Sequence, residues 1–291
     1  MFACLLAASL LAIGSPRIVL QKLGLVALDQ RPSAEDLLCG NYSDEEWSVS
    51  VAGGKLKVKR GANSPQPDPL PFEVPGGEDR IGRRHIARVT DGWLVGFDAG
   101  EFGGGLWWHS SDGRGSVHVS PSTDGPAHPN DVHRAENVLG FVRMRGELLV
   151  LMGLDHGSSR SGRVFRSVKR DNHWALASVA VLDARPAAWT IDGSRLLVLT
   201  ESGLWAVTVD MGATQIHRSD TTDQPAFPHL AALALLYPNS LVRGPDGALY
   251  AGMRRYVLRF EPLGDQWTET WLVSKDCVRV RIVGLECQCL P

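Results

Sequence analysis

The chain has 291 residues, of which 44% are hydrophobic, so it contains enough apolar material for a core and is not disordered throughout. Its 30 basic and 32 acidic residues give a formal net charge of -2, and without a basic excess to release counterions it is not expected to bind nucleic acid. The 31 glycines and 17 prolines favour many turns over long helices.

The N-terminus has the pattern of an export signal. An apolar run of about a dozen residues ends with the small residues Ala12 and Gly14 in front of Ser15, as at a signal-peptide cleavage site. The run is shorter than the roughly 20 residues of a membrane span, and no other stretch is apolar and long enough to be one. Because no Lys or Arg precedes the run, a core-packed strand or helix is the alternative. We expect a signal peptide at 1–14, an N-terminal segment at 15–39 and a secreted or periplasmic protein.

Cysteines lie only at the two ends of the chain. Loss of Cys4 with the signal leaves four: Cys39, Cys277, Cys287 and Cys289. An even number in an exported protein indicates disulfides, here with three alternative connectivities. A bridge between the last two would be strained, and a bridge from Cys39 to one of the C-terminal cysteines would tie the chain ends together. The Cys-x-Cys spacing does not match a zinc site.

Two short helical segments are predicted. Residues 33–36 read Ser-Ala-Glu-Asp, a capping-box pattern that can open a helix. Residues 229–236 form the best helical pattern in the rest of the chain, and Pro238 ends it.

One hairpin pattern recurs along the chain. A short apolar run reaches a glycine-containing turn, and a β-rich run leaves it. The glycines that mark the five copies are Gly54, Gly92, Gly146, Gly193 and Gly247, at steps of 38, 54, 47 and 54 residues. A further strand is expected after four of the turns, at residues 105–109, 162–166, 203–207 and 255–260. This is the period and composition of a four-stranded propeller blade.

The last copy carries a family resemblance. Residues 238–252, with Pro-Asn, an apolar strand and a Pro-Asp-Gly turn, resemble the blade of NHL and gluconolactonase-type propellers. We therefore expect an all-β fold: a single β-propeller of five or six four-stranded antiparallel blades over residues 40–291, with few short helices. A sixth repeat would lie near 110–140. Residues 279–283 are expected to complete a blade beside the N-terminal strand.

Residues 96–109 contain the highest density of residues that could contact a ligand. Two carboxylates, three successive glycines and paired tryptophans can provide close backbone approach, hydrogen-bond acceptors and stacking surfaces. We predict a ligand site made by Asp98, Glu101, Trp107, Trp108 and His109. The alternative is that the glycines form a wide blade turn and that a tryptophan is wedged between blades.

The resemblance also implies a metal. Gluconolactonase-type enzymes hold a divalent cation with carboxylate and asparagine ligands, and Asn239 matches the asparagine of their Pro-Asn motif. Glu136 and Asn137 are expected to begin another inner strand. Asp131 and His133, on one face of a strand, are a second candidate set for metal binding or proton transfer.

Two functions follow from these observations. The balanced charge and the lack of a catalytic signature favour an exported, non-catalytic binding propeller whose ligand is a protein, a peptide or a carbohydrate. The alternative is a metal-dependent hydrolase of the gluconolactonase type, with a divalent cation as cofactor. The paired tryptophans favour a carbohydrate or an aromatic clamp.

Overall fold

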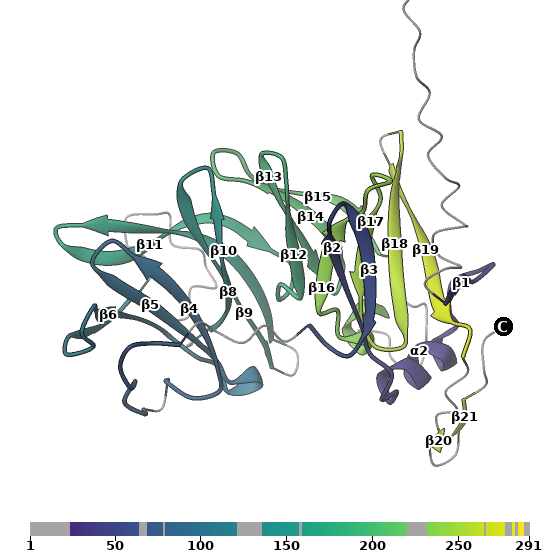
Figure 1. Cartoon of the computed structure of the whole chain (residues 1–291), viewed down its shortest axis with the longest axis horizontal. Coiled ribbons are helices and arrows are strands. Elements are labelled where there is room, and N and C mark those ends of the chain that lie inside the picture. The colour runs from purple at the N-terminus through teal and green to yellow at the C-terminus, as the bar shows by residue number, and fades with distance from the viewer. Residues whose placement is uncertain are drawn as a thin grey trace, which may run out of the picture.

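The computed structural model describes residues 24–63, 69–77, 79–120, 136–156, 159–219, 232–264, 266–276, 281–282 and 285–287. Nearly all regular structure in this part of the chain is β-strand (Figure 1). No helix among these residues has the length and apolar character needed to cross a membrane. The expected signal peptide at 1–14 lies outside the described residues, as do Asp131 and His133.

The strands form antiparallel sheets, and four of these sheets each contain a set of four consecutive strands. One sheet contains β4 (Arg83–Val89), β5 (Gly92–Asp98), β6 (Leu106–Ser110) and β7 (Ser116–His118). The next contains β8 (Asn137–Met144), β9 (Glu147–His156), β10 (Ser159–Arg170) and β11 (His173–Leu182). A third contains β12 (Ala188–Asp192), β13 (Arg195–Thr200), β14 (Gly203–Thr208) and β15 (Gly212–Arg218). The fourth contains β16 (Ser240–Arg243), β17 (Leu249–Gly252), β18 (Tyr256–Leu263) and β19 (Gln266–Ser274).

Three smaller pieces complete the strands, and one helix lies between the first two of them in the sequence. The short strand β1 (Leu25–Ala27) pairs with β19, so the fourth sheet has five strands. A separate hairpin is formed by β2 (Trp47–Ala52) and β3 (Lys55–Arg60), and a second one by β20 (Arg281–Ile282) and β21 (Leu285–Glu286). The helix is α2 (Ala34–Asn41). Two separate 3-10 turns lie later in the chain, η1 (Gly100–Phe102) and η2 (Ala232–Leu236).

All five glycine-marked hairpins are confirmed, and so are the four expected third strands, which correspond to β6, β10, β14 and β18. Gly146, Gly193 and Gly247 have φ values of 80°, 59° and 83°, which only glycine adopts readily. Gly92 is needed for another reason: a Cβ there would lie 1.9 Å from the backbone oxygen of His109 on the neighbouring strand β6. Of residues 110–140, where a sixth repeat was expected, the described strands belong to β6, β7 and β8.

Successive sheets pack face to face around buried apolar side chains. Leu94 of β5 and Val138 of β8 belong to the cluster between the first two four-stranded sheets. In β13, Leu196 and Leu197 are both fully buried, the first toward the preceding sheet and the second toward the following one. Burying one such side chain contributes about 1.5–3 kcal/mol. The hairpin β2–β3 packs in the same way on the fourth sheet, through Val49.

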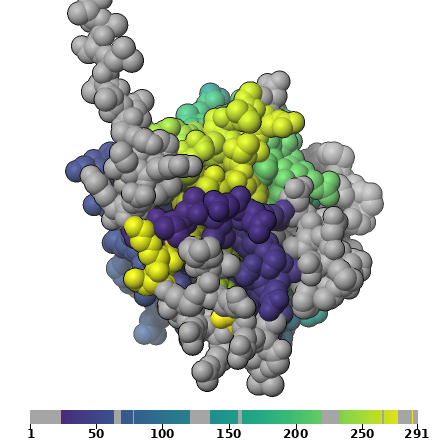
Figure 2. Space-filling model, turned by 90° about the vertical axis from the view of Figure 1, so that its right-hand side faces the viewer, coloured from purple at the N-terminus to yellow at the C-terminus, as the bar shows by residue number. Residues whose placement is uncertain are grey.

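The predicted capping box and the predicted cross-link are both present near the N-terminus. Ser33 Oγ accepts a hydrogen bond from Asp36 N at 3.2 Å, and Asp36 Oδ2 accepts one from Ser33 N at 3.0 Å. Cys39 of α2 is disulfide-bonded to Cys287. Figure 2 shows the N-terminal segment, in purple, lying beside the C-terminal strands, in yellow. Cys277 and Cys289 lie outside the described residues.

Two expected elements differ from the structure. Residues 279–283 were expected to pair beside the N-terminal strand, but Arg281–Ile282 pairs with Leu285–Glu286. The N-terminal strand pairs instead with β19, where Leu25 is opposite Ser274, because the long hairpin β18–β19 leaves that edge open. In the expected helix at 229–236, residues 232–236 form the 3-10 turn η2, and residues 229–231 lie outside the described part.

Candidate functional site

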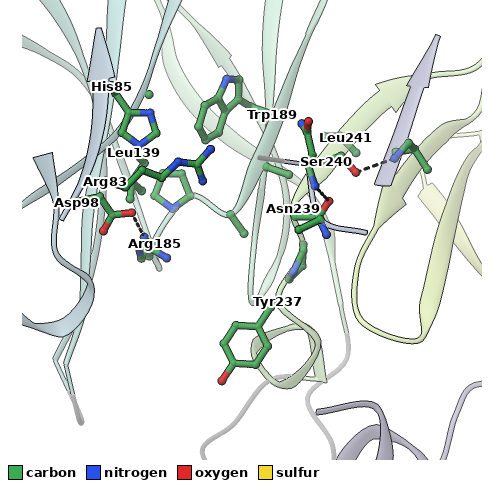
Figure 3. A pocket seen from close by; sticks show the side chains of 18 of the residues that line it. Arg83, His85, Asp98, Leu139, Arg185, Trp189, Tyr237, Asn239, Ser240 and Leu241 are labelled. Carbon is green, nitrogen blue, oxygen red and sulfur yellow. Dashed lines mark hydrogen bonds and ion pairs between the residues drawn. The ribbon is translucent and has the colours of Figure 1, made fainter. Parts of the chain in front are cut away.

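A cavity of about 860 Å³ lies where the first strands of successive sheets converge (Figure 3). The strands β2, β4, β8, β12 and β16 all contribute lining residues, together with the segments directly before β12 and β16. A concave site of this size, with apolar walls and a few convergent polar groups, is the usual form of a small-ligand site.

Strand direction brings the polar lining residues to one end of this cavity. In an antiparallel hairpin the start of the first strand lies beside the end of the second. Arg83, the first residue of β4, is therefore paired with Asp98, the last residue of β5. By the same rule Asp155 near the end of β9, Arg185 just before β12 and Asn239 just before β16 belong to this end.

At this end of the cavity an ion pair joins the first four-stranded sheet to the segment that precedes the third, so the two partners are separated in the sequence by the whole second sheet. Arg185 Nη2 donates to Asp98 Oδ2 at 2.8 Å, and the side chains are 35% and 16% exposed. Asp98 Oδ1 accepts a further hydrogen bond from Gly100 N at 3.1 Å. Arg185 Nε is buried and has no hydrogen-bond partner among the described residues. Arg185 therefore retains unused hydrogen-bonding capacity beside the cavity.

His85, on the same wall, is held in its neutral form. Burial, reinforced by the positive charges of Arg83 and Arg185 and opposed by Asp98, lowers the pKa of His85 to about 4. Its Nε2 is buried and has no hydrogen-bond partner in the described part of the chain. At neutral pH this imidazole has one donor nitrogen and one acceptor nitrogen, and the Nε2 position is unsatisfied.

Two carboxylates on the cavity wall share one arginine. Arg160 Nη1 donates to Glu201 Oε1, and Arg160 Nε lies 3.8 Å from Asp155 Oδ1. Burial raises the pKa of Glu201, although the charge of Arg160 opposes that rise. A carboxyl group with a raised pKa in a cavity is a usual feature of proton-transfer sites, but partly buried carboxylates in structural ion-pair networks also have shifted pKa values.

The opposite side of the cavity is formed by neutral and aromatic groups (Figure 3). Asn239 Nδ2 donates to Glu46 Oε1 and to Trp47 O, both at 3.1 Å. Its Oδ1 accepts from Asn63 N at 3.3 Å. The lining residue Tyr237 is 52% exposed, and the Arg254 guanidinium lies 4.2 Å from its ring centroid. Both polar groups of Asn239 are thus engaged with the protein, and this side of the cavity offers an aromatic face.

Trp189 of β12 contributes a large aromatic surface to the wall. Its indole ring lies against the backbone of Gly140 on β8, where a Cβ would come within 2.4 Å of Trp189 Cζ2. A glycine at 140 is thus required for the ring to occupy this position. The β-bulge between Val138 and Gly140 lies at the same point of β8.

The structure separates the residues predicted as the ligand site. Asp98 lines the cavity, whereas Glu101 lies on the exposed turn η1, with its Oε2 3.8 Å from His156 Nδ1. The stretch Trp107–His109 belongs to β6, the third strand of its sheet, and is absent from the described lining. Binding of a ligand by this whole set stays a prediction.

The β6 residues have clear packing partners. Trp107 Nε1 donates to Asp79 Oδ2 at 3.1 Å, and the Arg80 guanidinium lies 3.4 Å from the Trp107 ring centroid. Trp108 packs against the cluster between the first two four-stranded sheets. His109 is fully buried beside Phe72, and burial lowers its pKa. These contacts attach the segment before β4 to its sheet.

The candidate residues that the sequence did not single out lie on first strands or directly before one. His85 is on β4, Trp189 is on β12 and Arg185 lies just before β12, and none of them belongs to a motif. The repeat itself contained a usable signal, because the first strand always precedes the marker glycine and lines the cavity. Polar and aromatic residues near or just before the start of each first strand would have been the ones to choose.

The cation expected from the family resemblance does not fit these side chains. Both polar groups of Asn239 are engaged with the protein, and Asp98 is held by Arg185. Asp155 and Glu201 are both held by Arg160. Among the described residues, no three His, Cys, Asp or Glu side chains are grouped as a metal would require. Glu136 pairs with Arg163 at 3.4 Å, and Asn137, which does begin the inner strand β8, bonds to the backbone of Ala99.

Comparison with known proteins does not assign a family. No protein-family model matches the chain, and no curated protein matches it. Among solved structures, it is similar to the computationally designed protein Ika8, with a TM-score of 0.36 and 12% identity over 75% of this chain and 56% of that one. It is also similar to an oligogalacturonate lyase in complex with manganese, with a TM-score of 0.34 and 10% identity over 66% of this chain and 48% of that one.

A third similar structure is a glucose dehydrogenase, with a TM-score of 0.30 and 11% identity over 66% of this chain and 85% of that one. The chain thus spans about half the length of the first two proteins. At these TM-scores the likenesses define neither the fold nor the activity of this chain.

Proposed function

We propose that this chain is an exported, non-catalytic binding protein with a five-bladed β-propeller fold, and that it binds a carbohydrate in the cavity at the centre of the ring. The four larger sheets would be four blades, and the hairpin β2–β3 would be a reduced fifth blade. The observation that carries the proposal is the convergence of all five first strands on one cavity.

Contacts between distant sheets support the ring. Arg185, before the third four-stranded sheet, bonds Asp98 of the first, although a complete sheet lies between them in the sequence. Asn239, before β16, bonds Glu46 and the backbone of Asn63, which lie on either side of the hairpin β2–β3. Such contacts arise when first strands are arranged around an axis rather than in an open row.

The chemistry of the lining supports a hydroxylated ligand. Carboxylates, guanidiniums and amides offer donors and acceptors to sugar hydroxyls, and the flat faces of Trp189 and Tyr237 can stack on a sugar ring. The disulfide between Cys39 and Cys287 supports export, because such bonds persist in oxidising compartments. A peptide or a protein loop is the other ligand class that these groups can accommodate.

A matched pair of tryptophan variants tests the proposal. Trp189 and Trp205 are both partly buried and both pack against the same apolar cluster, but only Trp189 lines the cavity. Calorimetric titration with a panel of monosaccharides and disaccharides should detect a ligand. Trp189→Leu should weaken its binding about tenfold, and Trp205→Leu should leave it unchanged. Equal effects of the two variants, or no binding across the panel, would contradict the proposal.

The alternative function is a metal-dependent hydrolase of the gluconolactonase type. The position of Asn239 in the cavity favours it, but the bonds of that side chain to Glu46, Trp47 and Asn63 oppose it. Metal analysis of the purified protein separates the two. Stoichiometric calcium or zinc that is lost in Asn239→Ala, together with lactone hydrolysis, would replace the binding function with this one.

A further inference from the structure

Positive charge is concentrated on one wall of the cavity. We define the cationic wall as Arg83, Arg84 and Arg185, with the neutral His85 among them, from β4 and the segment before β12. Among the described lining residues, Asp98 is the carboxylate beside this wall, and it is bonded to Arg185. The other lining carboxylates are held elsewhere, as the bonds of Arg160 and Asn239 show.

Two nitrogen atoms of this wall lack the partners that buried polar atoms normally have. They are His85 Nε2 and Arg185 Nε. A buried polar group without a partner destabilises the protein, because it has lost its hydrogen bonds to water. Such groups on a cavity wall are explained if a ligand supplies the missing acceptor, with the His85 imidazole in the tautomer that carries its proton on Nε2.

A carboxylate satisfies these requirements better than a hydroxyl group does. It carries the opposite charge to the wall, it accepts several hydrogen bonds, and charge-assisted bonds are roughly twice as strong as neutral ones. The rest of the cavity, with Trp189, Tyr237 and Asn239, suits a hydroxylated ring. Resting on the carbohydrate-binding function proposed above, we infer that the ligand is a sugar acid whose carboxylate is bound by Arg185 and His85.

Binding requires a small rearrangement of the wall. Both unpartnered nitrogens are covered in the ligand-free arrangement, so the Arg185 side chain must rotate to present Nε. That side chain is 35% exposed and is attached to Asp98 by one hydrogen bond, which leaves it room to turn. The same Asp98 contact keeps the guanidinium at the cavity between binding events, which makes Asp98 a positioning residue.

The test compares ligands that differ only in charge. Glucuronate and glucose share a ring, and the methyl ester of glucuronate keeps the carbonyl but not the charge. We expect glucuronate to bind at least about tenfold tighter than either neutral compound, which corresponds to about 1.4 kcal/mol or more. Arg185→Gln and His85→Gln should each reduce the ratio of glucuronate affinity to glucose affinity.

Arg195→Gln is the matched control. Arg195 also donates through one Nη2 to a single aspartate, Asp192, but it begins β13 and does not line the cavity. The control should keep the full preference for glucuronate. Equal binding of glucuronate and glucose, or a preference that survives in both Arg185→Gln and His85→Gln, overturns the inference and leaves carbohydrate binding intact.

Two further outcomes also decide the question. If acetate binds as tightly as glucuronate, the wall is a site for carboxylates in general and not for sugar acids. If neither glucose nor glucuronate binds, the carbohydrate-binding function fails together with the inference. Should Arg185→Gln fail to fold, the His85→Gln comparison gives the same answer, because Nε2 of His85 makes no hydrogen bond in the described part of the chain that the variant would remove.

Discussion

Arg185 Nη2 donates to Asp98 Oδ2 at 2.8 Å and so joins the segment before β12 to the end of β5, across one full intervening sheet. Because this pair is partly buried, we expect it to couple the two sheets energetically. A double-mutant cycle with Asp98→Asn and Arg185→Gln should give a coupling energy of about 1 kcal/mol by urea unfolding.

The pair Asp192–Arg195 provides the comparison for this cycle. It joins neighbouring residues at one hairpin, and Arg195 is 45% exposed, so its coupling should be below about 0.5 kcal/mol. A coupling energy near zero for Asp98 and Arg185 would mean that the first and third four-stranded sheets are not held together at the cavity.

Gly140 should be intolerant of any side chain. A Cβ at this position would lie 2.4 Å from Trp189 Cζ2, so Gly140→Ala must displace the indole ring. We expect a loss of about 1–3 kcal/mol of unfolding free energy and weaker ligand binding. Gly76→Ala is the control, because a Cβ there would meet nothing within 4 Å. Unchanged stability and binding in Gly140→Ala would show that Trp189 does not occupy the wall position.

The disulfide should stabilise the protein by closing a very long loop. Cys39 and Cys287 are separated by 248 residues, and a cross-link of this kind typically contributes about 2–4 kcal/mol. The double variant Cys39→Ser, Cys287→Ser should lower the unfolding free energy by that amount. Peptide mapping by mass spectrometry should recover the two cysteines in one linked species. Cys39 recovered as a thiol, or linked to another cysteine, would contradict this connectivity.

Acid should destabilise the fold through its buried histidines. Folding lowers the pKa of His109 below the ordinary value of 6.5 and that of His85 to about 4. The unfolded chain therefore takes up protons first, and stability present above about pH 6.5 is lost as the pH falls toward 4. His109→Phe should keep the fold and reduce this loss between pH 7.5 and pH 5, measured by urea unfolding.

The exposed His173 provides the control for the pH experiment, since His173→Gln should leave the pH dependence unchanged. A pH dependence that is identical in wild type and His109→Phe would show that His109 titrates normally and is not enclosed by Phe72 and its sheet.

Much of the fold could be predicted because the repeat depends on residues that lie close together in the sequence. The marker glycines stand where a hairpin needs positive φ, as at Gly193 and Gly247, and the capping box at Ser33 requires only two side chains and two backbone groups. Each feature involves residues a few positions apart. For that reason the hairpins, the third strands and the helix α2 were all predictable.

The cavity could not be predicted in the same way because it depends on which strands of the separate sheets meet to line it. The stretch containing Trp107 and Trp108 is chemically dense, yet it lies on a third strand with packing partners on both sides. Arg185 and His85 are unremarkable in sequence and become distinctive only when sheets far apart in the chain meet. The pairing of the N-terminal strand with β19 likewise depends on which sheet edge is left open.

A crystal structure of the protein with a bound saccharide from the panel would test the central claim most directly. We predict ligand density in the central cavity, between the wall of Arg185 and Trp189 and the facing side of Tyr237 and Asn239. Density on the surface of β6, stacked on Trp107 or Trp108 with the cavity unchanged, would contradict the account and return the site to the stretch that the sequence alone favours.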